Sequence, residues 1–185
     1  MIWRAALLGL AMLAGSINGV WAHALPGSVL LLSQQGSTLQ LTIQFPAEDL
    51  IIAAPELEGL EEVAAGQPLP PELAVALSRY LEQHLSLTEN GDPLAPTMTD
   101  ARVRSTYHDH LGHFALVVSQ WHMTVAGDRS TPLVLTYDAV MHEVRNHRAT
   151  VQWIGQNGAS RPVAEFGLFS ATDGISLDPR LAAQE

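Results

Sequence analysis

Apolar and polar residues alternate in several short stretches, and this period of two predicts β-strands through most of the chain. The clearest case is Thr38–Phe45, where Leu39, Leu41, Ile43 and Phe45 fall on one face of a half-buried strand. Further strands are expected in Ser28–Ser33, Arg102–His108, His113–Val125, Pro132–Met141 and Arg148–Ile154. Turn residues separate these strands at intervals of roughly 10 to 15 positions, which favours an antiparallel, immunoglobulin-like β-sandwich over a parallel sheet.

One stretch has a helical period instead. Leucines recur at every fourth position from Leu73 to Leu85 and form an apolar stripe. Pro71 suits the first turn of a helix, and Asn90-Gly91 is a stop signal. We therefore expect a mainly β fold with one amphipathic helix of about 15 residues packed against it.

The first two dozen residues have the pattern of a secretory signal peptide. The apolar core Ala5–Ala14 follows a positive charge and is too short for a bilayer, which needs roughly 20 residues. Small residues permit cleavage after Ala22 or after Ala24, and an uncleaved anchor is the alternative. We expect residues 25–185 to form a single β-rich periplasmic domain, without a transmembrane segment in the mature chain.

Composition narrows the classes of function. The 185 residues include 9 Arg, no Lys and 19 acidic residues, which gives a net charge of −10. Such a chain is poorly suited to nucleic acid or to an anionic membrane surface. It has no Cys, so a transition-metal site must be built from imidazole and carboxylate groups.

Histidines cluster in the segment Tyr107–His113. In an extended strand His108 and His110 point to the same face, because the side-chain period is two. If Leu111-Gly112 forms a two-residue hairpin turn, His110 and His113 become cross-strand neighbours, and the three imidazoles converge. Three imidazoles are a ligand set that Zn, Cu or Ni prefers. The alternatives are solvated histidines at a strand end and a pH-sensitive contact.

A second constellation contains His142, Glu143 and His147. It differs from the zinc-protease pattern H-E-x-x-H by one extra residue, so the two imidazoles would not share a helix face. We therefore reject a zinc protease and keep His142 and His147 as secondary candidate ligands on a loop. The alternative is that both are hydrogen-bonded turn residues that join two strands.

Motifs of common enzymes are missing: the chain has no Walker loop, no G-x-S-x-G and no EF-hand loop. An enzyme stays open as a minor alternative, either for metal-assisted hydrolysis or as a copper oxidase that uses His23, which cleavage after Ala22 would leave as a chelating N-terminus. With no evident nucleophile or general base, we expect a non-catalytic protein.

Three stretches resemble a known family in their order along the chain. They are His23–Val29, Tyr80–Leu85 with Gly91-Asp92-Pro93 after it, and Thr136–His142 with the continuation to His147. Together they resemble the extracytoplasmic N-terminal region of HupE/UreJ-type membrane proteins of hydrogenase and urease accessory systems. The resemblance implies an exported β-rich domain and a link to nickel or another transition metal. The family's membrane portion does not follow within these 185 residues, so transport by this chain alone is not expected.

The leading hypothesis is a periplasmic metal-binding or metal-handling accessory domain without catalytic activity. His108, His110 and His113 are the first candidate ligands for Ni, Cu or Zn, and His142 and His147 are the second. The alternative is a periplasmic interaction module that binds a membrane-protein partner, in which the histidines are structural.

Overall fold

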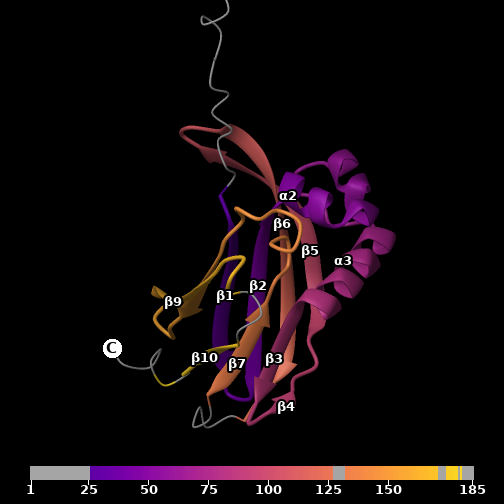
Figure 1. Ribbon diagram of the computed structural model, residues 1–185. Helices are drawn as coiled ribbons and strands as arrows, with labels where there is room; N and C mark the ends of the chain where they lie inside the picture. Colours follow the sequence, from indigo (N-terminus) through magenta and orange to yellow (C-terminus); the bar gives the residue numbers. More distant parts are fainter. Residues whose placement is uncertain (1–25, 127–131, 171–173, 179, 181–185) are drawn as a thin grey trace, which may run out of the picture.

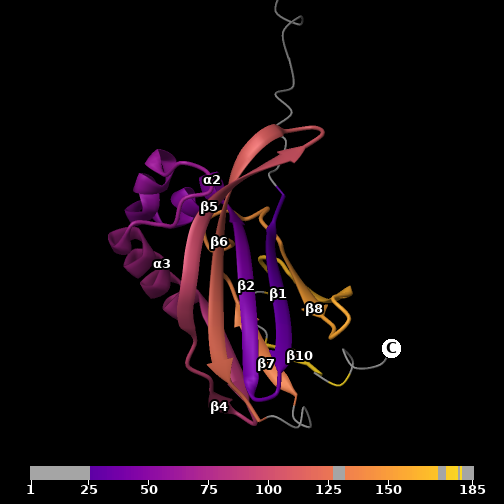
Figure 2. The same cartoon turned by 180° about the vertical axis from the view of Figure 1, so that it is seen from behind.

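Two β-sheets face each other across an apolar core in the computed structural model (Figures 1 and 2). The structure describes residues 26–126, 132–170, 174–178 and 180. The mainly β, two-sheet architecture that the strand pattern predicted is confirmed. The predicted signal peptide lies outside the described residues and stays a prediction.

The larger sheet has six strands in the order β5-β6-β2-β1-β8-β9. These strands are β1 Ser28–Gln35, β2 Thr38–Pro46, β5 Thr97–His108, β6 Gly112–Thr124, β8 Ala149–Ile154 and β9 Ser160–Phe166. All neighbours are antiparallel except β1 and β8, which run parallel and which the sequence did not predict as partners.

The smaller sheet has four strands in the order β10-β7-β3-β4. They are β3 Leu85–Glu89, β4 Asp92–Pro93, β7 Leu133–Tyr137 and β10 Ile175–Leu177. β7 is shorter than the predicted strand Pro132–Met141, because the chain leaves the sheet after Tyr137 to form a loop. β9 and β10 come from C-terminal sequence whose periodicity was too weak to predict strands.

Several helices lie along one side of the sheets (Figure 1), whereas the sequence predicted a single helix. The predicted helix is α3, Pro71–His84, and it is confirmed. It ends at His84 because the buried positions then change from helical spacing to the alternation of Leu85 and Leu87 in β3. The additional helices are α2, Ala47–Ala53, and the 3-10 helix η1, Pro55–Glu62.

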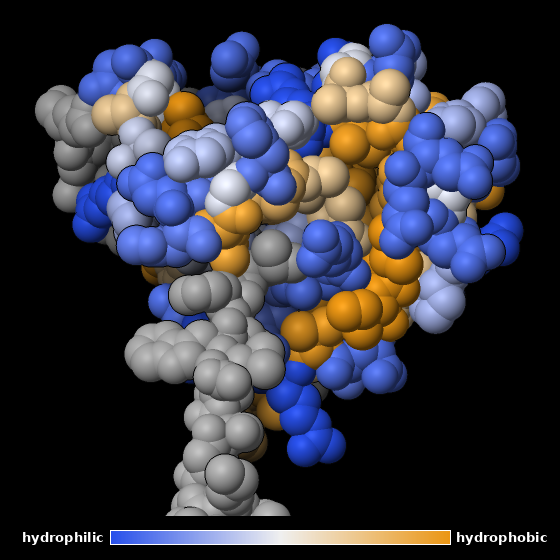
Figure 3. Space-filling model, turned by 90° about the horizontal axis from the view of Figure 1, so that it is seen from above, coloured by the Kyte–Doolittle hydropathy of each residue, from blue (hydrophilic) through white to orange (hydrophobic). Residues whose placement is uncertain are grey.

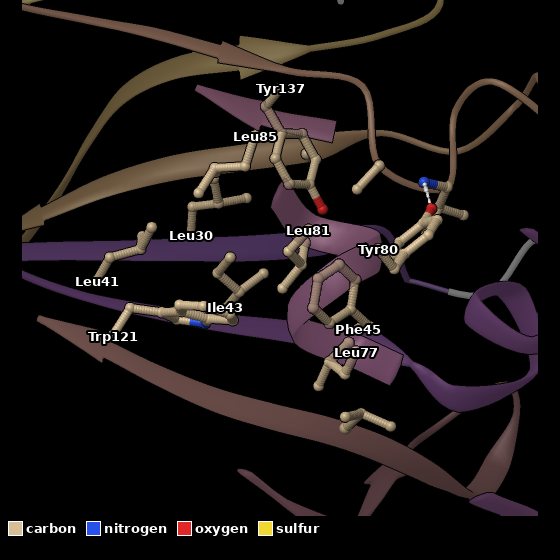
Figure 4. Close-up of a cluster of buried hydrophobic side chains, with 14 of the residues drawn as sticks. Leu30, Leu41, Ile43, Phe45, Leu77, Tyr80, Leu81, Leu85, Trp121 and Tyr137 are labelled. Atoms are coloured by element: carbon tan, nitrogen blue, oxygen red, sulfur yellow. Dashed lines mark hydrogen bonds between the residues drawn. The ribbon is translucent and has the colours of Figure 1, made fainter. Parts of the chain in front are cut away.

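The core lies between the sheets and beneath α3 (Figure 4). Leu39, Leu41, Ile43 and Phe45 are fully buried, as their alternation predicted. Trp121 on β6 is 1% exposed, and its indole N–H donates a hydrogen bond to the Ser119 hydroxyl at 2.9 Å. Burial of each such large apolar side chain stabilises the fold by roughly 1.5–3 kcal/mol.

Within the described ranges, no helix combines the length and the apolar character that crossing a bilayer requires.

Candidate functional site at the loop between β7 and β8

The start of β1, the last turns of α3 and the loop after β7 meet in one polar cluster. The loop of residues 138–148, which joins β7 to β8, contacts the other two. Its C-terminal part reaches Ser28 at the start of β1, and its N-terminal part reaches the last turns of α3. Residues distant in sequence thus form one polar cluster around this loop.

His147 is the buried anchor of the loop, with a side chain that is 0% exposed. Its Nδ1 lies 2.8 Å from Oδ2 of Asp49 in α2. On the other side of the ring, Nε2 accepts the backbone N–H of Ser28 at 3.1 Å and lies 2.8 Å from the Ser28 hydroxyl. Because Nε2 accepts a hydrogen bond from a backbone N–H, the ring proton of the neutral form belongs on Nδ1, where it donates to the carboxylate.

Ser28, His147 and Asp49 have the hydrogen-bond order of a serine-hydrolase triad. The surroundings do not suit that chemistry. Ser28 is only 1% exposed, so a substrate cannot approach its hydroxyl. Its own backbone N–H, which donates to the Arg148 carbonyl at 2.8 Å, also lies 3.1 Å from the Nε2 atom that would have to take the serine proton. The three residues therefore join β1, α2 and the loop as a structural clamp.

A second histidine–carboxylate pair lies closer to the surface. His84 Nδ1, at the end of α3, lies 2.8 Å from Oδ1 of Asp138. The His142 ring stacks on the His84 ring with centroids 4.2 Å apart and planes 14° apart. Beside this pair is a shallow pocket of about 170 Å³ whose lining includes His84, Asp138 and Thr136.

Tyr80 connects α3 to a strained position in the same loop. Its hydroxyl accepts the backbone N–H of Val140 at 2.7 Å (Figure 4). Val140 has φ +70°, a left-handed conformation that is unfavourable for a β-branched side chain. Burial raises the pKa of Tyr80 well above its ordinary value, and the hydrogen bond from Val140 partly opposes that shift. The bond and the surrounding core hold Val140 in its strained conformation.

Tyr137 places a further hydroxyl beneath the loop. Burial raises the pKa of Tyr137 strongly, and the nearby Ser28 side chain acts in the opposite direction. The hydroxyl makes no hydrogen bond of ordinary geometry to the residues that the structure describes. It is thus a buried polar group at the boundary between core and clamp.

The first predicted ligand set lies elsewhere, at the tip of the β5–β6 hairpin, and the two-residue turn on which its convergence depended does not form. Gly112 belongs to β6 and pairs with His108, so the turn comprises residues 109–111. Leu111 N–H donates to the His108 carbonyl at 3.1 Å, and Gly112 has φ +76°. A primed two-residue turn would need Leu111 at positive φ, whereas here glycine alone takes the left-handed conformation.

This register separates the three imidazoles. His113 pairs with Tyr107 and contacts its ring at 5.2 Å, so His113 and His108 lie on opposite faces of the hairpin. His110 lies in the turn, with its ring centroid 5.8 Å from that of His108. The structure therefore brings His108 and His110 together and leaves His113 apart.

The described part of the chain contains no group of three His, Asp or Glu side chains placed to hold one metal ion. His147 is enclosed by Ser28 and Asp49. His84 and His142 cannot share a metal in their stacked arrangement, because a metal lies in the plane of each ring and nearly parallel planes do not meet nearby.

Sequence reasoning missed the partners of the histidines. Asp49, Tyr80, His84 and Asp138 were not candidates, since single acids and a helix histidine carry no distinctive spacing. Asp138 lay within the stretch Thr136–His142 that resembles the family, and this resemblance was the one sequence signal that pointed to Asp138. The alternative interpretation of His147, a hydrogen-bonded residue that joins segments, agrees with its contacts.

Comparison with known proteins gives no identification: neither the family models nor the curated proteins include a match to this chain. Function must therefore be argued from the residues themselves.

Proposed function

We propose that this chain is a non-catalytic, extracytoplasmic interaction module whose β5–β6 hairpin contacts a membrane-protein partner. The observation that carries the proposal is the free-standing end of this hairpin. Pairing of β2 with β6 ends at Pro46 and Leu116, whereas β5 and β6 remain paired as far as His108 and Gly112. Residues 105–115 thus project beyond the sheet as a two-stranded ribbon (Figures 1 and 2).

The projecting ribbon, residues 105–115, carries side chains that suit a protein contact. Tyr107 is 60% exposed, and exposed aromatic residues often dominate interface energetics. His108, His110 and His113 are exposed around it. A two-stranded ribbon is marginally stable on its own, so docking against a partner would stabilise it.

The clamp and the His84–Asp138 pair support a binding role over a catalytic one. They hold the β7–β8 loop against α2, α3 and β1 at the ribbon's end of the molecule (Figure 1). Hydrophilic residues cover much of this end, with strips of apolar surface between them (Figure 3). A rigid loop region, together with a projecting ribbon that carries an exposed aromatic side chain, is suited to recognition of a partner surface.

Site-specific photo-crosslinking in the native host tests the proposal. A photoreactive amino acid at position 107 should give a discrete adduct with a membrane protein. The control places the same group at Gln120, which is exposed on β6 within the sheet. Adducts from both positions, or none from position 107, would contradict the proposal.

A second candidate function is transition-metal binding at the ribbon tip, favoured by the placement of His108 and His110. Two imidazoles that share one metal have ring centroids roughly 4.5 to 6 Å apart, given metal–nitrogen distances near 2 Å. The 5.8 Å separation falls in this range.

Calorimetric titration with Ni, Cu and Zn tests this candidate. Binding tighter than about 10 μM that disappears in the variant H108A/H110A supports it. The variant H113A is a matched control, because His113 lies on the other face of the ribbon and should leave the affinity unchanged. Absence of binding at that affinity, or an equal loss of affinity in H108A/H110A and in H113A, contradicts metal binding at the ribbon tip.

A further inference from the structure

The strand order creates a crevice at the opposite end of β1 from the clamp. β1 and β8 are parallel neighbours, but β1 turns into β2 on one side and β8 turns into β9 on the other. Their pairing stops at Leu32 and Trp153, although β1 continues to Gln35. Both connections are hairpins within the same sheet, and they carry the chain away from the gap beyond the carboxyl ends of β1 and β8.

A cavity of about 540 Å³ occupies this position. Ser33, Gln35 and Gly36 line it from the β1–β2 hairpin. Trp153 and Gln156 line it from the β8–β9 hairpin. This volume falls within the range of roughly 300–1,000 Å³ that small-molecule sites have. The divergence of β8 and β9 from β1 is visible toward the lower ends of these strands (Figures 1 and 2).

The lining contains no ionisable side chain, although 15% of the whole chain is charged. Its polar side chains are one serine hydroxyl and the amides of Gln34, Gln35 and Gln156. The amides of Gln35 and Gln156 are exposed and offer both donors and acceptors, whereas the buried Gln34 amide donates to backbone carbonyls. Ile154 adds apolar surface, together with the small exposed part of Trp153, which is 4% exposed. Such a lining matches a neutral ligand with many hydroxyl groups and one apolar face.

Hydrogen bonds hold both walls of the crevice in place before any ligand binds. The buried Gln34 amide donates to the Gly36 carbonyl at 3.0 Å and to the Ala126 carbonyl at 3.2 Å. In the other hairpin, Gly155 N–H donates to the Ala159 carbonyl at 2.8 Å, and Gly158 N–H donates to the Gly155 carbonyl. Because these turn N–H groups are engaged, the β8–β9 wall offers side-chain amides rather than a strand edge. This favours a saccharide over an extended peptide.

We infer that the crevice between the carboxyl ends of β1 and β8 binds a small neutral saccharide through the amides of Gln35 and Gln156. The site is independent of the ribbon and of the clamp. The cavity volume of about 540 Å³ has room for one or two sugar units.

Titration of the full chain with neutral disaccharides, including maltose and chitobiose, tests this inference through calorimetry and tryptophan fluorescence. At least one should bind with a Kd below about 5 mM. Q35A and Q156A should each weaken that binding about five- to tenfold, by loss of one amide's hydrogen bonds. Both residues are exposed, so the thermal midpoint should change little.

The variant Q120A is the matched control, since Gln120 is an exposed glutamine on β6 outside the crevice. It should bind the disaccharide as the unmodified chain does. The inference is overturned if none of these disaccharides binds below about 5 mM, or if Q35A and Q156A bind as tightly as Q120A. Binding of a neutral hexapeptide in place of the saccharides would also overturn it.

Discussion

His147 Nδ1 lies 2.8 Å from the carboxylate of Asp49, although 98 positions separate the two residues. The same ring binds the first residue of β1 through both the backbone and the side chain of Ser28. One buried imidazole therefore joins α2, β1 and the loop before β8. This relationship makes His147 a structural residue.

Replacement of His147 by alanine should lower the free energy of unfolding by about 2–4 kcal/mol. The change removes the hydrogen bonds of the ring to Asp49 and to Ser28 and creates a cavity, although Ser28 N–H keeps the Arg148 carbonyl as an acceptor at 2.8 Å. Urea denaturation measures the effect. His122→Ala is the control, because His122 is exposed on β6, and it should change stability by less than about 0.5 kcal/mol. Equal effects of the two variants would show that the clamp contributes nothing.

At Val140, the usual order of stability of alanine and glycine variants should be reversed. At a buried strand position such as Val151, glycine should be worse than alanine by about 0.5–1 kcal/mol. At Val140, whose φ is +70°, glycine relieves the backbone strain that alanine retains. V140G should therefore be more stable than V140A, as measured by chemical denaturation. If V140G is the less stable variant, the left-handed conformation is not a source of strain.

Tyr80 should make stability sensitive to alkaline pH. Its pKa is raised in the folded state, so its contribution is fully present below the unfolded-state pKa of about 10 and is lost as pH rises beyond it. At pH 7, Y80F should be less stable by about 1–3 kcal/mol, because the Val140 N–H loses its acceptor. The difference should shrink between about pH 10 and pH 11. A pH-independent difference would contradict this, and Tyr107→Phe is the exposed control.

Asp100 should contribute to the loss of stability in acid. The Arg102 guanidinium, which donates to its carboxylate at 2.8 Å and 3.0 Å, lowers the pKa of Asp100. The contribution is therefore present above the unfolded-state pKa of about 3.9 and is lost as pH falls through the lower folded-state value. D100N should be less stable than the unmodified chain at pH 7, and the difference should decline toward pH 3.

Asp109 supplies the control for this measurement, because it forms no ion pair with the residues that the structure describes. D109N should show no decline of this kind between pH 7 and pH 3. A constant difference for D100N across the same range would exclude the ion pair as its cause.

Local periodicity predicted the fold because it reports which face of an element is buried. The alternation around Leu41 and Ile43 predicted β2, and the leucines after Pro71 predicted α3. The parallel neighbours β1 and β8 escaped prediction, because pairing between strands more than 100 positions apart leaves no periodic signal.

The candidate site was predicted only in part, because its partners are long-range. Nothing in the sequence near His147 indicates Asp49, and nothing near His84 indicates Asp138. At the hairpin tip, displacement of the turn placed His113 on the face opposite His108. The resulting register, rather than the residue types, decides which histidines approach each other.

The most direct test of the interaction-module proposal is quantitative binding of the purified chain to membrane vesicles from the native host. The proposal predicts saturable binding that protease treatment of the vesicles abolishes. Tyr107→Ser should weaken that binding at least about tenfold, whereas Gln120→Ser should not change it. Binding that does not saturate, survives protease treatment or is equal in both variants would contradict the proposal.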